Sequence, residues 1–533
     1  MPNEYQGTYS VIGPPGTGKT TFIVNQVAKL VDQGVSTLLC SLTRTAAREI
    51  VQRRLPIDRK AIGTLHSHAY RSIGAPAVVD VTAFNEFQKL YRLTPQKVDS
   101  DEPIRGGTPD DGRLMMYECN RARRLPRDAW QTEIRKFAEV WESFKNCTHS
   151  IDYGDMIEKA MNCPPPFNPR VIIADETQDF SRAEMDLLKR WRQHADALIA
   201  AGDPWQSLYE WRGADPEAMF MSLDEDHRRV LHQSYRVPRA VHALATRWIK
   251  GLSTWRPIEY APTPQSGEVV GSGGTWQDVA PLLEMVMEHV EAGKTIMFCG
   301  SCSYIIGPLI SSLRAMGVPY ANPWRLTRRD WNPLATTDGK PSTAARIQAF
   351  LAPLKRHLFW TGAELLLWGP MVSAKGVFHR GSKGRLPELD ENHNELSLDQ
   401  LRQYLTDEFV AVADKLLAGG QKAMLDWLSG NMVASRAEVA EFPLAVWRRH
   451  PEWIDKDPLV YVGTIHSFKG AEADTVVVFP DLSQKWYQAW TGPPAFHDSV
   501  VRLFYVAATR AKERLVLCRP ENDLYAVHLD KYR

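Results

Sequence analysis

The chain has 533 residues, of which 44% are hydrophobic and 24% charged, and its formal net charge is +1. The length predicts several globular domains, and the charge excludes a polycation, so any nucleic-acid surface must be local. No run of 18 apolar residues occurs, so we expect no membrane span. The N-terminus has no basic-then-apolar signal, so we expect a cytoplasmic protein.

A phosphate-binding pattern opens the chain. A short apolar strand is expected at residues 9–12, and helical periodicity begins near residue 22. Between them lies a glycine-rich turn made of Gly13, Pro14, Pro15, Gly16, Thr17, Gly18, Lys19, Thr20 and Thr21. In this setting, backbone N–H groups surround phosphates. We expect Lys19 to reach the β- and γ-phosphates of ATP and the Thr20 hydroxyl to bind Mg²⁺.

The next elements are a strand at residues 36–40 and a strand end at residues 63–67. Residues 75–150 then become mainly helical, polar and rich in arginine, which predicts an inserted domain. Its arginines could contact the phosphates of a DNA duplex or form a solvated helix face. Both interpretations stay open for Arg121, Arg123, Arg124 and Arg127.

Polar residues follow two further predicted strands. Asp175 and Glu176 follow residues 171–174, and Gln206 follows residues 197–201. Sites in open parallel sheets form at this edge, and phosphoryl transfer to water needs a metal ligand and a base. We therefore expect Asp175 to bind Mg²⁺ and Glu176 to be the base, with an acidic helix cap as the alternative for both. Gln206 is placed to sense a γ-phosphate.

An aromatic and basic pair comes a few residues later. Trp211 and Arg212 offer a flat stacking surface and a phosphate contact, by which proteins hold single strands without reading sequence. A tryptophan is nonetheless more often buried, so core packing is the alternative for Trp211.

A second α/β unit begins near residue 241. Its strands are expected at residues 295–299, 459–465, 475–479 and 514–518. A long irregular and helical region between residues 322 and 457 is interpreted as a second insertion. Strands that alternate with helices predict a parallel α/β architecture.

Taken together, these blocks resemble the UvrD/Rep/PcrA family of superfamily 1 helicases. Further blocks agree with the family's order: they resemble motifs Ia, Ib, IV, V and VI, at residues 41–49, 63–67, 233–236, 463–472 and 504–512. The resemblance covers more than half of the chain. It implies two RecA-like parallel-sheet lobes with ATP between them, each carrying a mainly helical insertion. The implied subdomains are 1A at 1–74 and 151–240, 1B at 75–150, 2A at 241–325 and 456–533, and a reduced 2B at 326–455.

The resemblance also implies roles for single residues. Arg236 and Arg510 would be arginine fingers that stabilise the transferring phosphoryl group. Tyr235 would stack on the base of the nucleotide, and Glu472 would accept a hydrogen bond from the ribose. The implied DNA contacts are Thr43, Arg44, Thr64, His66, Trp211, Arg212, Thr464 and His466. A purely structural role is the alternative for each histidine.

The sequence departs from the family pattern in three places. The glutamine that usually reads adenine upstream of the phosphate loop is missing, and Gln6 is the nearby candidate. Leu42 stands where motif Ia usually has a DNA-stacking aromatic, and the second insertion is shorter than usual. The missing glutamine predicts relaxed base selectivity, and the other two departures bear on the grip on single bases and on regulation by 2B.

The function expected from these blocks is that of an ATP-dependent single-stranded DNA translocase and helicase with 3′–5′ polarity. Its partners would be single-stranded DNA and duplex junctions, with an accessory nuclease or a repair or replication protein as a further candidate. One alternative is a motor subunit that unwinds only with such a partner. A nucleotide-gated DNA-binding switch is a second alternative, against which the intact Glu176, Arg236 and Arg510 argue.

Overall fold

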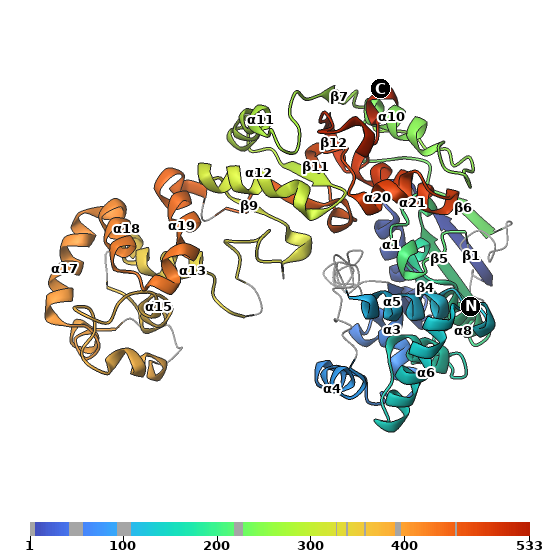
Figure 1. The fold of residues 1–533 in the computed structure, drawn as a ribbon, viewed down its shortest axis with the longest axis horizontal. Helices are drawn as coiled ribbons and strands as arrows, with labels where there is room; N and C mark the ends of the chain where they lie inside the picture. Colours follow the sequence, from blue (N-terminus) through green and yellow to red (C-terminus); the bar gives the residue numbers. More distant parts are fainter. Residues whose placement is uncertain are drawn as a thin grey trace. The chain divides into compact units, whose positions relative to one another are not determined.

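The computed structural model describes residues 6–41, 57–92, 108–217, 227–326, 328–336, 339–356, 359–389, 396–453 and 456–532. The predicted DNA contacts Thr43 and Arg44, and Leu42, lie outside these residues. The chain forms two compact units. Unit 1 comprises Met1–Val270, Leu482–Leu515 and Val527–Arg533, and unit 2 comprises Gly271–Asp481 and Val516–Ala526. Figure 1 shows the course of the chain.

Unit 1 contains a six-stranded sheet in the order β3-β2-β4-β5-β1-β6. The strands are β1 (Gly7–Ile12), β2 (Thr37–Ser41), β3 (Ile62–Thr64), β4 (Val171–Ala174), β5 (Ala197–Gly202) and β6 (Arg228–Val230). All neighbouring pairs are parallel. Parallel sheets are covered on both faces, so their strands are continuous apolar runs. This confirms the predicted parallel α/β class.

Helices cover both faces of this sheet, because alternate strand residues point to opposite sides. One face, which includes Leu39 and Ile173, packs on Ile23 and Val27 of α1 (Lys19–Asp32). The other face packs on α3, α7 and α8. The other described α-helices of unit 1 outside the first insertion are α3 (Leu65–Ser72), α7 (Tyr153–Ala160), α8 (Arg182–Arg192), α10 (Arg239–Ile249), α20 (Gln484–Trp490) and α21 (Pro494–Ala508).

The first helical insertion has an aromatic core of its own. It consists of α4 (Val81–Tyr91), α5 (Pro109–Ala122) and α6 (Thr132–Cys147). Phe87 packs edge-on against Trp141, and both side chains are buried. This core is distinct from the two clusters that cover the sheet.

The second sheet has the order β7-β12-β11-β8-β10-β9, and β8 pairs in parallel with β10 and β11. Its strands are β7 (Glu268–Gly271), β8 (Ile296–Gly300), β9 (Tyr320–Ala321), β10 (Val460–Thr464), β11 (Ala473–Val478) and β12 (Ala511–Leu517). Its helices are α11 (Ala280–Glu291) and α12 (Ser303–Met316). The boundary between the units falls within β7 and β12.

The second insertion, within unit 2, is helical and also has its own core. Trp360, Trp368, Phe350 and Phe409 pack together at its centre. Its helices are α13 (Thr343–Leu351), α14 (Pro353–Arg356), α15 (Gly362–Trp368), α16 (Leu398–Leu401), α17 (Asp407–Ala418), α18 (Gly420–Asn431) and α19 (Ala434–Arg449). Among the described residues, no helix has the length and apolar character needed to cross a membrane.

Candidate functional site

Three neighbouring strands of unit 1 bring the predicted nucleotide motifs to one edge of the sheet. The phosphate loop follows β1, Asp175 follows β4, and Asp203 follows β5. The order β4-β5-β1 makes these strand ends adjacent. The Gly13 N–H donates to the carbonyl of Gly202 at 2.9 Å, which ties the start of the loop to the end of β5. This is the edge at which open α/β sheets bind ligands.

The phosphate loop closes on itself through its own polar groups. Lys19 Nζ donates to the Gly13 carbonyl at 2.9 Å, and Thr17 Oγ1 donates to the Pro14 carbonyl at 2.8 Å. Gly16 has φ 73°, in the region that favours glycine, and a Cβ there would lie 2.6 Å from Arg236 Cβ. Glycine is therefore required where the loop meets the segment that carries Arg236.

Residues 233–236 are fixed to the phosphate loop by two hydrogen bonds, and a third lies within the segment. The buried Ser234 Oγ donates to the Pro15 carbonyl at 2.8 Å and accepts from the Arg236 N–H at 3.3 Å. The Tyr235 N–H donates to the Gly16 carbonyl at 2.8 Å, while its ring is 77% exposed. The structure thus places Arg236 beside the loop and leaves the Tyr235 ring accessible for stacking.

The two carboxylates after β4 differ in their surroundings. Asp175 is 2% exposed, and its Oδ1 accepts from the Glu176 N–H at 2.9 Å. Glu176 has φ 57° and precedes the short helix Thr177–Asp179 without making a side-chain cap bond. The capping alternative therefore does not describe Glu176. The hydroxyl of Thr20 and the carboxylate of Asp175 are oxygen donors of the kind that Mg²⁺ prefers.

The structure brings Gln206 and Arg510 into contact within unit 1. Arg510 Nη2 donates to Gln206 Oε1 at 2.6 Å, and Gln206 Nε2 donates to Asp203 Oδ2 at 2.5 Å. Gln206 is 5% exposed and Arg510 is 2% exposed. Burial raises the pKa of Asp203, and the positive charge of Lys19 opposes that rise.

The predicted DNA contacts of unit 1 lie after β3 and β5. Thr64 Oγ1 caps α3 by accepting from the Ser67 N–H at 3.2 Å, which is a structural role. His66 Nδ1 lies 3.5 Å from Glu184 Oε1. Burial lowers the pKa of His66, and the nearby Glu184 carboxylate opposes this.

Trp211 is half-buried, unlike the fully buried Trp191 of α8. Its indole Nε1 is buried and has no hydrogen-bond partner among the described residues. The Arg212 guanidinium lies 5.7 Å from the centre of the Tyr209 ring. Trp211 is therefore partly accessible, and DNA stacking and core packing both stay predictions for it.

The predicted contacts of unit 2 are mostly buried. Thr464 and His466, at the end of β10, are 1% and 2% exposed. Ser467 Oγ donates to the Thr464 carbonyl at 2.6 Å and accepts from Asn322 Nδ2 at 2.9 Å. Glu472 is exposed. DNA contact by Thr464 and His466, and ribose contact by Glu472, stay predictions.

The comparisons with known proteins agree with these motifs. A family model described as "AAA domain" matches residues 4–212, and one described as "UvrD-like helicase C-terminal domain" matches residues 459–518. "ATP-dependent DNA helicase PcrA" of Staphylococcus aureus (strain NCTC 8325 / PS 47) is 23% identical over 329 residues, which are 54% of this chain and 44% of that protein. The protein of the same name from Staphylococcus epidermidis (strain ATCC 12228 / FDA PCI 1200) is 24% identical over 54% of this chain and 45% of its own length.

In both matched regions the chain is similar to UvrD/PcrA-like superfamily 1 helicases. The matched region spans less than half the length of these relatives. Gln6, the sequence candidate for reading adenine in this UvrD/PcrA-like chain, is exposed, and its backbone N–H donates to Tyr9 Oη at 3.4 Å.

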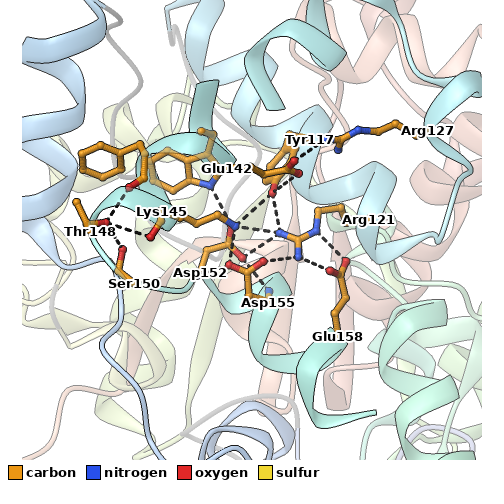
Figure 2. Close-up of polar contacts among 12 residues, drawn as sticks. Tyr117, Arg121, Arg127, Glu142, Lys145, Thr148, Ser150, Asp152, Asp155 and Glu158 are labelled. Carbon is orange, nitrogen blue, oxygen red and sulfur yellow. Dashed lines mark hydrogen bonds and ion pairs between the residues drawn. The ribbon is translucent and has the colours of Figure 1, made fainter. Parts of the chain in front are cut away.

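In the first insertion of this UvrD/PcrA-like chain, the contacts of Arg121 differ from both sequence interpretations, the duplex contact and the solvated helix face. Arg121 is 9% exposed and donates to Asp152 (3.0 Å), Asp155 (2.7 Å) and Glu158 (2.6 Å). Lys145 donates to Asp152 at 2.6 Å and to Asp155 at 2.5 Å (Figure 2). Burial alone would raise the pKa of Asp152, but Arg121 and Lys145 lower it to about 2. Arg121 is thus neither a duplex contact nor part of a solvated face.

The other three arginines also have partners within unit 1. Arg123 Nη2 donates to the Glu210 carbonyl at 3.0 Å, Arg124 pairs with Asp186 at 2.9 Å, and Arg127 pairs with Glu142 at 2.6 Å. The pairs of Arg121, Arg123 and Arg124 fix the C-terminal end of α5, and that of Arg127 joins the following turn to α6. Asp152, Asp155 and Glu158 lie at the start of and along α7, but their spacing alone does not identify Arg121 as their partner.

Sequence reasoning also missed Glu210. Its carboxylate forms an ion pair with Arg502 of α21, which is 5% exposed on its side chain. Burial raises the pKa of Glu210 to about 7, and Arg502 opposes this rise. Glu210 immediately precedes Trp211, so this pair joins the predicted DNA-stacking segment to the helix that leads to Arg510.

Proposed function

We propose that the chain is an ATP-dependent translocase on single-stranded DNA that separates duplex strands with 3′–5′ polarity. The observation that carries this proposal is the cluster at the edge of β4, β5 and β1, where a phosphate loop, two carboxylates, Gln206 and two arginines meet in unit 1. The similarity to the two DNA helicases named above supports DNA as the substrate and unwinding as the outcome.

The residues divide the hydrolysis reaction among them. The loop N–H groups and Lys19 hold the β- and γ-phosphates, and Mg²⁺, held by Thr20 and Asp175, would neutralise phosphate charge. Glu176 accepts a proton from the water that attacks the γ-phosphorus. The bond to the β–γ bridging oxygen breaks, which yields ADP and phosphate. Arg236 and Arg510 stabilise the charge that spreads over the transferring group.

DNA binding is assigned to the strand ends beside the nucleotide cluster. The half-buried Trp211 supplies a face for one base, and Arg212 supplies a cation for the backbone. Glu210 joins these residues to α21, which leads to Arg510. Hydrolysis and the grip on DNA would then be coupled through one short segment.

A strand-displacement assay on 3′-tailed and 5′-tailed duplexes tests the proposal. We expect ATP-dependent unwinding of the 3′-tailed substrate alone. Unwinding of the 5′-tailed substrate alone would overturn the polarity. DNA-stimulated hydrolysis without unwinding of either duplex would favour the motor subunit that needs a partner nuclease or effector. DNA binding without stimulated hydrolysis would favour the nucleotide-gated switch.

A further inference from the structure

A continuous chain of hydrogen bonds runs between Glu176 and Arg510. Gln178 Nε2 donates to Glu176 Oε2 at 2.5 Å, and the Asp203 N–H donates to Gln178 Oε1 at 3.0 Å. Gln206 Nε2 donates to Asp203 Oδ2 at 2.5 Å, and Arg510 Nη2 donates to Gln206 Oε1 at 2.6 Å. All of these residues belong to unit 1, and Gln178 and Asp203 are fully buried.

The donors and acceptors that flank each glutamine fix the orientation of its side-chain amide. A backbone N–H and a guanidinium can only donate, while a carboxylate accepts. Gln178 must therefore present Oε1 to Asp203 and Nε2 to Glu176. Gln206 must present Oε1 to Arg510 and Nε2 to Asp203. Neither amide can rotate by half a turn without losing both of its bonds.

We propose that Gln178 is a positioning residue that orients the Glu176 carboxylate. Through Asp203, it links the orientation of this carboxylate to the positions of Gln206 and Arg510. The inference rests on the proposed ATPase function. Glu176 follows β4 and precedes the short helix Thr177–Asp179, with left-handed backbone, and its carboxylate accepts a hydrogen bond from Gln178 of that helix. The bond from Gln178 restrains it. A base contributes fully only when it is aimed at the proton that it accepts.

Two substitutions of Gln178 separate positioning from packing. Gln178→Met keeps the approximate length but removes both hydrogen bonds. Gln178→Glu keeps the acceptor for the Asp203 N–H and places a second carboxylate against Glu176. We expect single-turnover ATP hydrolysis at saturating single-stranded DNA to fall on the order of 10- to 100-fold in Gln178→Met. We expect Gln178→Glu to be no faster than Gln178→Met.

Nucleotide affinity is the second readout. The dissociation constant of a non-hydrolysable ATP analogue should stay within about twofold of wild type in both variants, because the loop and Lys19 hold the phosphates. If Gln178 only satisfied the Asp203 N–H, Gln178→Glu would hydrolyse ATP like wild type while Gln178→Met would not. That order would overturn the inference, and so would a wild-type rate in Gln178→Met.

Thr177→Val provides a matched control. Thr177 is fully buried, and its Oγ1 donates to the Ala201 carbonyl of β5 at 3.0 Å, so it anchors the same segment to β5 rather than to the Glu176 carboxylate. This variant should melt at a lower temperature yet hydrolyse ATP within about twofold of wild type. A loss of hydrolysis as large as that of Gln178→Met would show that any anchor of the segment suffices, and would overturn the specific role of Gln178.

Wild type and Glu176→Gln, measured beside these variants, show which proposal has failed. No DNA-stimulated hydrolysis by wild type would remove the proposed function and this inference together. Hydrolysis by wild type but not by Glu176→Gln, with wild-type rates in both Gln178 variants, would leave the proposed function intact and remove this inference alone.

Discussion

Glu176 combines an unusual backbone conformation with a proposed catalytic role. Its φ of 57° is costly for a side chain with a Cβ, by roughly 1–3 kcal/mol for such conformations. Its neighbours sustain that conformation: Asp175 accepts the Glu176 N–H, and Gln178 binds the carboxylate. A backbone held in this way directs the carboxylate off the end of β4, toward the edge where the phosphate loop lies.

Glu176→Gln should bind ATP normally but lose DNA-stimulated hydrolysis. The amide keeps the size of the side chain but cannot accept the proton of the attacking water, and a general base contributes about 10²–10⁴-fold. ATPase rates with and without single-stranded DNA, beside the affinity for a non-hydrolysable analogue, measure the effect. Turnover within a few-fold of wild type would remove Glu176 from the mechanism.

Arg510→Ala should block hydrolysis with little loss of nucleotide affinity. An arginine finger acts on charge that develops in the transition state, so kcat should fall by about 10³-fold or more. Steady-state kinetics separate kcat from KM. A normal kcat with a raised KM would show that Arg510 binds only the ground-state phosphate.

Trp211→Ala should weaken single-stranded DNA binding by about 1–3 kcal/mol, the value of one base stack. Its indole N–H has no hydrogen-bond partner among the described residues, so the substitution breaks no such bond. Trp191→Ala is the control, because this fully buried tryptophan should instead cost about 3–5 kcal/mol of stability. Melting temperatures beside DNA affinities distinguish the two, and a Trp211→Ala variant that loses stability but not affinity would contradict the stacking role.

Among the elements, α21 is joined to the segment after β5 by the ion pair of Arg502 and Glu210. Because burial raises the folded-state pKa of Glu210 to about 7, the folded protein binds more protons than the unfolded chain between the usual glutamate pKa and pH 7. The free energy of unfolding should therefore decrease as the pH rises through this window, by at most about 1.4 kcal/mol per pH unit from this group.

Glu210→Gln isolates that contribution. The amide can still accept a hydrogen bond from Arg502 but does not titrate, so the difference in unfolding free energy between variant and wild type should change with pH. Denaturant unfolding at a series of pH values from 4.5 to 7.5 measures the difference (about one point per half unit). A difference that is constant across the series would contradict the raised pKa.

The elements that sequence could predict are those with simple patterns. β4 occupies Val171–Ala174, the expected residues, because a strand buried on both faces is a continuous apolar run. The position of the polar groups after β4 and β5 could also be predicted, because the carboxyl ends of parallel strands lie at one edge of the sheet. The ion pairs of Arg121 could not be predicted, because its partners lie 31 to 37 positions away and depend on how α5 packs on α7. The contact of Arg510 with Gln206 spans 304 positions, beyond any local pattern.

At the scale of the whole molecule, most of the predicted nucleotide contacts lie in unit 1, and Glu472 lies in unit 2. A non-hydrolysable ATP analogue should therefore slow amide exchange around residues 13–20, 175–179 and 203–206 of unit 1. If Glu472 binds the ribose, amide exchange should also slow, to a smaller extent, in the residues that come directly after β10. Saturation at 100 times the dissociation constant should stabilise unit 1 by about 2.7 kcal/mol. Protection confined to unit 2 would contradict the assignment of the site.

The division of the chain has a consequence for its synthesis. Unit 1 takes its first and largest segment from Met1–Val270, but α21 and Arg510 come from Leu482–Leu515, after most of unit 2. On the ribosome, the phosphate loop emerges early and the arginine that meets Gln206 emerges late. Under the proposed function, a nascent chain would present the residues proposed to hold ATP long before the arginine proposed to assist its hydrolysis, so hydrolysis would begin only after α21 has been made.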